Sequence, residues 1–260
     1  MTYQVIGLMG PFKMIDHINT LIIGINSGIG MAIAQKLDKD GHNLYGTTRS
    51  KELLEKNRNP WKNYYLDLDK TDSFDDFAHE ITKELSWDNL IFCPATMQPI
   101  GPFESLDISE WVNSFSVNFT SQIYLLQKLL KARNPSKSKV LFFAGGGTNS
   151  SPKNYSCYTA SKIALIKMVE LLDNEIMNTA FTILGPGWVK TKIHSQSLMP
   201  GNENYESYKE TKRRINENDF GDINHVIDSI VWILNQPKEI VGGRNFSSIH
   251  DPWGSEELEL

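Results

Sequence analysis

The sequence has few of the features that place a protein in a membrane, on a nucleic acid or in an oxidising compartment. Its 260 residues include only two cysteines, Cys93 and Cys157, and their positions give neither metal-ligand spacing nor a disulfide framework. No apolar run approaches the roughly 20 residues that cross a membrane. The N-terminus lacks the basic and apolar regions of a secretory signal. A net charge of −5 argues against a nucleic-acid partner. We therefore expect a cytoplasmic protein with reduced thiols and no metal, membrane or nucleic-acid ligand.

Strand signals alternate with helix signals along the chain, and this alternation predicts a parallel sheet covered by helices on both faces. We expect strands at residues 20–24, 43–47, 63–67, 89–93, 139–144, 180–184 and 239–246. Helices are expected at residues 28–40, 72–85, 108–133, 158–176 and 223–235. The fold class is therefore α/β, with one domain built on a doubly wound, mostly seven-stranded parallel sheet. Such a sheet binds its ligand at the carboxyl ends of the strands.

Two regions fall outside this regular pattern. Residues 1–17 precede the first strand and are expected to be a poorly ordered extension, which leaves residues 18–260 as the domain itself. Residues 193–220 are polar and charged, and the run Pro200-Gly201-Asn202 interrupts them. Their composition predicts an insertion between the sixth strand and the last helix.

A glycine-rich turn follows the first predicted strand and opens the first predicted helix. It reads Gly24-Ile25-Asn26-Ser27-Gly28-Ile29-Gly30. Glycines let the backbone approach a pyrophosphate, and the helix N-terminus offers free N–H groups with a partial positive charge. The context of strand, turn and helix favours a dinucleotide site over a tight turn without a ligand.

Tyr158 and Lys162 stand four residues apart on a predicted helix, so their side chains share one face. A phenol with a pKa of about 10 is a poor acid or base at neutral pH. A neighbouring ammonium favours the phenolate and lowers the pKa of the phenol. The pair therefore suits proton transfer to or from a carbonyl or alcohol oxygen. The structural alternative, for an isolated pair, is a surface tyrosine beside a solvated lysine.

Two further motifs complete a resemblance to a known family. Asn118 lies in the long predicted helix, and the sixth strand is followed by Pro186-Gly187-Trp188-Val189-Lys190-Thr191. With the glycine turn and the Tyr-Lys pair in the same order, the chain resembles the short-chain dehydrogenase/reductase (SDR) family from about Thr20 to Phe246. The resemblance implies a Rossmann fold and an oxidoreductase that uses a nicotinamide cofactor on a small carbonyl or hydroxyl substrate.

The resemblance also implies roles for individual residues. Tyr158 would be the acid or base, and Lys162 would lower its pKa and hold the ribose hydroxyls of the cofactor. Asn118 would distort its helix and hold a water that links Lys162 to solvent. Residues 193–220 would form the substrate lid, although a solvated helix-turn insertion has the same composition.

By the same resemblance, the cofactor would contact residues in several separate segments. Asp67 and Leu68 match the adenine side, while Val189 and Thr191 would hold the nicotinamide carboxamide. The segment 93–96 keeps only the alanine of the family's Asn-Asn-Ala-Gly, which weakens the prediction for adenine packing. The full predicted set is Gly24, Asn26, Ser27, Gly28, Ile29, Gly30, Arg49, Asp67, Leu68, Ala95, Tyr158, Lys162, Pro186, Gly187, Val189 and Thr191.

Arg49 favours NADP over NAD. An NAD site carries an acidic residue at the end of the second strand for the ribose 2′-hydroxyl. The chain has none there, since the stretch reads Gly46-Thr47-Thr48-Arg49-Ser50. A guanidinium instead matches the oxygens of a 2′-phosphate. Ser27 is not the basic residue that many NADP-using relatives carry in the glycine turn, so NAD stays as the alternative.

One catalytic residue of the family is missing. The family places a serine at the end of the fifth strand to orient the substrate carbonyl, but here no hydroxyl precedes Thr148. Thr148 (or Ser150 or Ser151) could take that role from a pliable glycine loop. The backbone N–H groups of Gly145–Gly147 could instead bind the oxygen. The third alternative is weak or lost activity.

Three functions follow from these observations. The first is an NADP-dependent oxidoreductase. The second is an NADP-binding regulatory or structural protein with little turnover, supported only by the missing serine. The third is an epimerase or dehydratase acting on a sugar nucleotide, which would need a larger carboxyl-terminal domain than this chain has.

The resemblance finally implies a homodimer or homotetramer. Subunits of the family pair through the helices predicted here over residues 108–133 and 158–176. Both helices carry more apolar residues than one buried face needs, including Ile123, Leu126, Leu129, Leu130, Ile166 and Val169.

Overall fold

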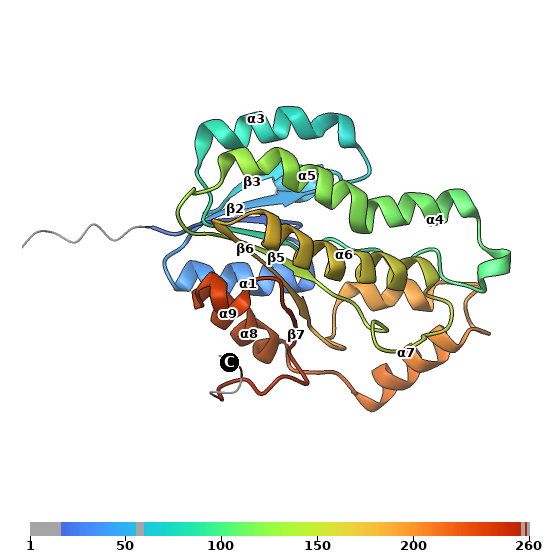
Figure 1. Cartoon of the computed structure of the whole chain (residues 1–260). Coiled ribbons are helices and arrows are strands. Elements are labelled where there is room, and N and C mark those ends of the chain that lie inside the picture. The colour runs from blue at the N-terminus through green and yellow to red at the C-terminus, as the bar shows by residue number, and fades with distance from the viewer. Residues whose placement is uncertain (1–16, 56–59, 256–257, 259–260) are drawn as a thin grey trace, which may run out of the picture.

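Short apolar runs form a central parallel sheet in a computed structural model that describes residues 17–55, 60–255 and 258 (Figure 1). Within these residues the sheet has seven strands, and every neighbouring pair is parallel. The strands are β1 (Asn19–Ile23), β2 (Asn43–Thr48), β3 (Lys62–Tyr65), β4 (Asn89–Phe92), β5 (Ser138–Phe143), β6 (Thr179–Gly185) and β7 (Asn245–Ser247). Their order is β3-β2-β1-β4-β5-β6-β7. The predicted doubly wound fold is therefore confirmed.

Side chains that alternate along the strands pack into two separate hydrophobic cores, one on each face of the sheet. In β1, Leu21 and Ile23 join the core on one face, whereas Ile22 joins the core on the other. The first core is covered by α3 (Phe74–Glu84), α5 (Ser121–Leu129) and α6 (Ser156–Glu175). The second is covered by α1 (Gly28–Lys39), α8 (Ile223–Asn235) and α9 (Lys238–Val241). Because both faces are covered, the central strands β1 and β4 contain continuous apolar runs.

The long helix expected over residues 108–133 is interrupted. It consists of α4 (Ile108–Phe115), a wider π-helical turn (Ser116–Thr120), α5, and a 3₁₀ turn (Leu130–Ala132). Figure 1 shows α4 and α6 side by side, at the end of the molecule that also holds α7 (Glu206–Glu217). The interruption falls at Asn118, so a predicted site residue stands where the helix changes its geometry.

Several local predictions were wrong. The last strand is shorter than expected, because Pro237 starts the short helix α9 and Gly243, at φ +70°, follows its end, so residues 239–241 are helical. The insertion at 193–220 contains a 3₁₀ helix (Lys192–Leu198) and α7, for which no separate helix bounds were predicted. The sequence also failed to predict α2 (Lys51–Glu55) and the 3₁₀ turn Phe103–Ser105, and the helix expected from residue 72 begins with a 3₁₀ turn (Thr71–Ser73).

The N-terminal extension predicted over residues 1–17 lies outside the described residues, apart from His17. Among the helices that the structure describes, none has both the length and the apolar character required to cross a membrane.

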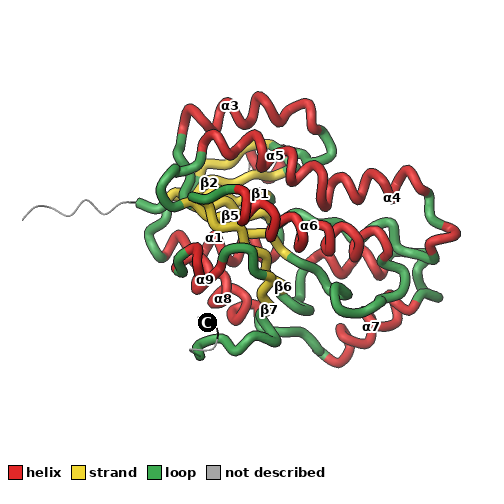
Figure 2. The backbone as a smooth tube through the Cα atoms, viewed as in Figure 1, coloured by secondary structure: helices red, strands yellow, loops and turns green. Residues whose placement is uncertain are grey.

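The strand order changes direction between β1 and β4, which are neighbours in the sheet but not in the sequence. In doubly wound sheets the crevice at such a point, at the carboxyl ends of the strands, is where ligands bind. The glycine turn follows β1 and the segment 93–96 follows β4, so both lie at this edge. Figure 2 shows the strands of the sheet between the helices of its two faces.

Candidate active site

Two positions of the glycine turn require glycine, one for its backbone conformation and one for lack of space. Gly24 adopts φ +76°, and its N–H donates to Oγ1 of Thr47 at 3.0 Å. A Cβ on Gly30 would lie 2.6 Å from the carbonyl oxygen of Gly24. Ser27 caps α1, since its Oγ accepts a hydrogen bond from Gly30 N at 2.9 Å. The turn therefore presents the N-terminus of a capped helix at the edge of the sheet.

The proline-glycine segment after β6 packs directly on this turn. A Cβ on Gly28 would lie 2.9 Å from Cγ2 of Thr191, so the two backbones approach closely. Val189 is buried in the core beneath, and Gly187 adopts φ +69°. Pro186 is half-buried beside them. Two parts of the predicted cofactor set, more than 150 residues apart in sequence, thus form one surface.

The remaining predicted cofactor residues follow the next strands along the same edge. Arg49 is exposed just after β2, and no described residue forms a hydrogen bond or ion pair with its guanidinium. Leu68 is buried and Asp67 is half-buried after β3, which pairs with β2 in register. Ala95 is half-buried after β4, next to Pro94, whose ring covers Gly24. Within the described part of the chain, the guanidinium of Arg49 is thus an unpaired cation just after β2.

Tyr158 and Lys162 lie on the first turns of α6, where that helix passes the end of β5. Lys162 is 2% exposed, and its Nζ donates to the carbonyl oxygen of Phe143 at 2.9 Å. The same Nζ lies 5.8 Å from the centre of the Tyr158 ring. Burial lowers the pKa of Lys162 to about 8 and raises the pKa of Tyr158 to about 12, with Tyr155 adding to the rise. Desolvation therefore outweighs the ammonium effect that the sequence predicts for the phenol.

Asn118 is fully buried within the π-helical turn. Its Oδ1 accepts from the backbone N–H of Thr96 at 2.8 Å, and its Nδ2 donates to the carbonyl oxygen of Thr96 at 2.8 Å. The helix distortion predicted at this residue is present. Its carboxamide thus holds both backbone groups of one residue, Thr96, in the segment after β4. The sequence did not predict this contact.

The glycine loop after β5 is shaped by Tyr158. A Cβ on Gly145 would lie 2.5 Å from Cε1 and 2.7 Å from Oη of Tyr158. The tyrosine thus fills the space that any side chain at position 145 would need. Thr148 is half-buried in the loop, whereas Ser150 and Ser151 are exposed. Among the described residues, no hydroxyl from this loop forms a hydrogen bond with Tyr158.

An apolar cluster that the sequence analysis missed packs against Tyr158. Its buried members are Met97, Ile100 and Tyr155, and Ile193 and Tyr205 of the insertion pack on them. Periodicity could not reveal this cluster, because its residues come from three segments of irregular backbone or short helix. The one available signal was the spacing of Tyr155 and Tyr158, three positions apart.

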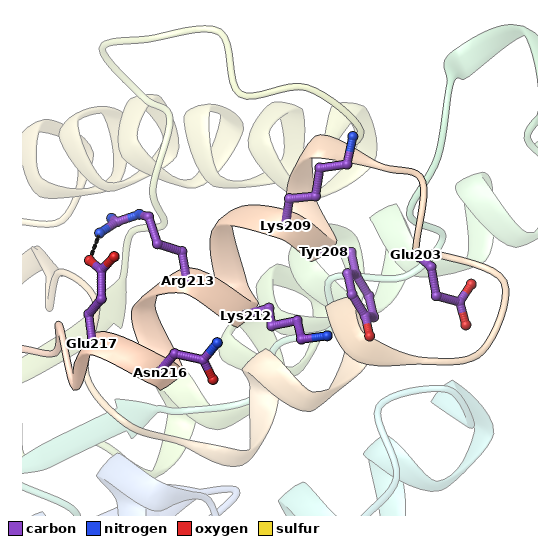
Figure 3. Close-up of a pocket in the computed structure, with 7 residues that line it drawn as sticks. All are labelled: Glu203, Tyr208, Lys209, Lys212, Arg213, Asn216 and Glu217. Atoms are coloured by element: carbon purple, nitrogen blue, oxygen red, sulfur yellow. Dashed lines mark hydrogen bonds and ion pairs between the residues drawn. The ribbon is translucent and has the colours of Figure 1, made fainter.

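The outer side of the insertion carries a shallow depression that is separate from these residues (Figure 3). Its lining consists of polar, mostly charged side chains at the end of the insertion's loop and along α7: Glu203, Tyr208, Lys209, Lys212, Arg213, Asn216 and Glu217. Arg213 is already paired with Glu210, Glu217 and Asp219. The depression contains none of the predicted catalytic or cofactor residues.

Comparison with known proteins identifies a family that matches most of the chain. Residues 19–199 match the family model described as short chain dehydrogenase. The chain is 27% identical over 240 residues to the NADPH-dependent 3-dehydrocapnine reductase of Ornithobacterium rhinotracheale, covering 86% of this chain and 81% of that protein.

Solved structures share the fold at lower identity. A short chain dehydrogenase/reductase from Saccharomyces cerevisiae superposes with a TM-score of 0.74 at 23% identity, covering 90% of this chain and 97% of that one. A short chain dehydrogenase from Shigella flexneri, complexed with NADP, gives a TM-score of 0.73 at 16% identity, with coverage of 89% and 97%. These likenesses support the fold described above.

The contact between Gly145 and Tyr158 predicts that position 145 tolerates no side chain. Gly145→Ala should lower the free energy of unfolding by about 1 to 3 kcal/mol, because the new methyl group overpacks the tyrosine ring. Urea denaturation measures this change. Gly146→Ala is the matched control, since a Cβ there meets its nearest neighbour, Nε1 of Trp188, only at 4.0 Å. Equal stability of the two variants would contradict the prediction.

Proposed function

Because this chain belongs to the short-chain dehydrogenase family and is an enzyme of that oxidoreductase type, we propose that it transfers a hydride between NADP(H) and a small carbonyl or hydroxyl compound. Tyr158 is the proposed proton donor or acceptor. The observation that carries the proposal is the position of the glycine turn, Asn118 and the Tyr158–Lys162 pair at one edge of the sheet. Residues 18–260 form the catalytic domain in this proposal.

The residues at this edge fit a dinucleotide. Gly24 and Gly30 let the turn fold tightly, since a Cβ at either position would meet Pro94 or the carbonyl oxygen of Gly24, and the N-terminus of α1 favours a pyrophosphate. The free cation of Arg49 supports NADP over NAD, as do the NADPH dependence of the bacterial relative and the NADP complex of the Shigella structure. When bound, the cofactor would supply or take the hydride. Asp67, Leu68 and Ala95 would lie along its adenosine side, and Val189 and Thr191 along its nicotinamide side.

In the reducing direction, Tyr158 would give its proton to the substrate oxygen as negative charge develops there. Its raised pKa keeps the phenol protonated before the reaction. Lys162, held by the carbonyl oxygen of Phe143, would stabilise the phenolate that remains. Asn118 would fix the peptide of Thr96 beside the site and, through the opened helix turn, hold a water that passes protons to Lys162.

The substrate would enter beneath the lid formed by residues 193–220. Ile193 and Tyr205 of the lid meet the buried side chains of Met97 and Ile100 next to Tyr158. This lining supports a neutral carbonyl compound with an apolar substituent. In the absence of a serine, the substrate oxygen would be oriented by Thr148 or by the N–H groups of Gly145–Gly147.

A second candidate function is a cofactor-binding protein with little turnover. The observation that favours it is Gly145, which leaves no side-chain hydroxyl beside Tyr158. The two functions differ in one measurable property, because only the enzyme oxidises NADPH in the presence of a carbonyl compound.

We also propose that the chain forms a homodimer, or a tetramer built from it, in the cytoplasm. The apolar residues first assigned to the interface belong largely to the core, since Leu126, Leu129 and Val169 are buried within it. Other apolar side chains are exposed on α4 and α6 instead: Ile108 is 62% exposed, Val112 59% and Ile163 47%. Apolar patches of this kind mark interfaces between subunits.

Replacement of Tyr158 tests the proposed chemistry. Tyr158→Phe should lower NADPH-dependent turnover at least about a hundredfold, because the ring remains but the transferable proton is gone. Affinity for NADPH, measured by protein fluorescence, should not change. Turnover is measured as loss of NADPH absorbance over a panel of ketones, acyl-thioester ketones and sugars.

One outcome would reject the proposal that this protein turns over a carbonyl substrate. Wild-type protein that binds NADPH but turns over no carbonyl compound in the panel would establish the binding protein.

If the wild-type protein is active, Thr148→Ala tests which group replaces the missing serine. A fall in turnover of about a hundredfold, or about 2.7 kcal/mol of transition-state stabilisation, assigns that role to Thr148. Unchanged turnover assigns it to the backbone of Gly145–Gly147.

The pH dependence of reduction should follow Lys162. Its ammonium is lost as pH rises through a pKa of about 8, whereas Tyr158 stays protonated up to about pH 12. Turnover should therefore be constant below about pH 7 and fall about tenfold for each further pH unit above the pKa. Initial rates at saturating NADPH measure this profile. A rate that stays flat to about pH 10 would show that the charge on Lys162 is not needed.

Cofactor preference should depend on Arg49. Arg49→Asp should weaken NADPH binding at least about tenfold and leave NADH binding equal or tighter, because the carboxylate repels a 2′-phosphate and accepts from a 2′-hydroxyl. Fluorescence titration of both cofactors measures the two affinities. Lys39→Asp, an exposed change of equal charge at the far end of α1, is the control. Tighter binding of NADH than NADPH by the unmodified protein would reject NADP.

Self-association is tested at the centre of the exposed α4 surface. Val112→Glu should convert the dimer to a monomer, because the carboxylate would be buried without a partner in the interface. Light scattering at micromolar concentration gives the mass. Met177→Glu is the control, since Met177 is 76% exposed but follows the end of α6. A monomeric wild-type protein would refute the proposal.

A further inference from the structure

Two glutamines join the lid to the segment that follows β4. Oε1 of Gln196 accepts from the backbone N–H of Met97 at 2.7 Å and from Oγ1 of Thr96 at 3.3 Å. In return, Nε2 of Gln98 donates to the backbone carbonyl oxygen of Gln196 at 3.1 Å. Each side chain thus bonds to the segment that carries the other. The 3₁₀ helix of the lid is held at its middle by this reciprocal pair.

The segment that receives Gln196 is itself fixed from below. Asn118 holds both the N–H and the carbonyl oxygen of Thr96 at 2.8 Å. The hydroxyl of Ser114, on α4, donates to the carbonyl oxygen of Gln98. A continuous chain of hydrogen bonds therefore runs from the buried helix turn through one peptide to the lid. The segment that binds Gln196 is therefore held in place by the packed helices beneath it.

Docking of the lid at this point covers Tyr158. Ile193 precedes Gln196 by one turn and packs on the apolar cluster around the tyrosine. Ser197 follows it, and the buried Ser197 Oγ lies 2.7 Å from Oη of Tyr155. These contacts contribute to the burial that raises the pKa of Tyr158, which is half-buried against the cluster. The solvation of the proposed proton donor thus depends on where the lid rests.

We infer that Gln196 is a positioning residue, which docks the substrate lid onto the Thr96–Met97 peptide and so sets the closed state in which Tyr158 meets the substrate. This inference rests on the proposed function of Tyr158. Among the described residues, Gln196 forms no hydrogen bond with Tyr158, Lys162 or Asn118. Gln196 acts through the Thr96–Met97 peptide, whose carbonyl oxygen accepts from Asn118. Asn118 and the lid are therefore joined by the same peptide.

Limited proteolysis tests the docking without any substrate. Gln196→Met keeps the length of the side chain but removes the acceptor for Met97 N and Thr96 Oγ1. Trypsin should then cleave the lid about tenfold faster, at the exposed residues Lys209, Lys212 and Arg213, since each lost bond favours the opened lid. Ser195→Ala is the matched control, because its hydroxyl bonds only to the carbonyl oxygen of Lys192 on the exposed side. Mass spectrometry locates the cuts.

Steady-state kinetics gives the second readout. With the ketone of the panel that wild-type protein reduces fastest, Gln196→Met should raise KM about tenfold while the affinity for NADPH stays within about twofold. Gln98→Met should act in the same direction, and the double variant should be less than additive because both side chains serve one contact. A general loss of folding would instead weaken NADPH binding as well.

Cleavage of Gln196→Met at the rate of Ser195→Ala would overturn the inference, as would equal loss of ketone and NADPH affinity. If Gln196→Met fails to fold, as judged by thermal melting, Gln98→Met carries both measurements. Failure of the proposed function is a separate result. It appears as absent turnover in wild-type protein, whereas the difference in proteolysis between Gln196→Met and Ser195→Ala would persist.

Discussion

The parallel pairing of β1, β4 and β5 is the constraint on which the candidate site depends. Ile23 lies opposite Phe92 in the sheet, and Ile91 lies opposite Leu141, so these three strands end at one edge. Chain segments that leave them must therefore meet there: the glycine turn, the Thr96 peptide and the glycine loop. No single segment forms the site by itself. Its geometry follows from register within the sheet, and register is fixed because a one-residue slip would exchange the side chains that fill the two different cores.

Burial gives the two ionisable groups of the site their properties. A lysine beside a tyrosine would lower the pKa of the phenol in water, but both groups here lie in a desolvated region, and each shifts toward its neutral form. The ammonium of Lys162 remains the major form at neutral pH, since its pKa is lowered only to about 8, and its Nζ donates to the carbonyl oxygen of Phe143. Cys93, after β4, has its pKa raised to about 12 by the same burial, although Ser27 and Lys162 oppose the shift. The thiol is therefore protonated and unreactive.

Local patterns in the sequence were sufficient for the fold and for the motifs, but not for contacts between distant segments. The helix at Ile223–Asn235 was predicted to the residue, because its apolar positions repeat with helical period. α7 was missed because its buried residues are Ser207 and Thr211, which give no apolar signal. The strand expected at 239–241 was wrong because Pro237 starts a helix there. The bond from Met97 to Gln196 spans 99 positions, and no periodicity reports such a pair.

The packing of Gly145 leaves no room for a side-chain hydroxyl at this position of the loop after β5. A side chain at this position would overlap the ring of Tyr158, so the phenol oxygen stands where a neighbouring hydroxyl would otherwise lie. Orientation of a substrate oxygen must then come from Tyr158 itself, from backbone N–H groups of the loop, and from the walls that confine the rest of the substrate. The lid supplies one of those walls through Ile193 and Tyr205. Because the site offers few polar contacts to the reacting atom, the orientation of the substrate depends more strongly on how firmly the lid is held in place.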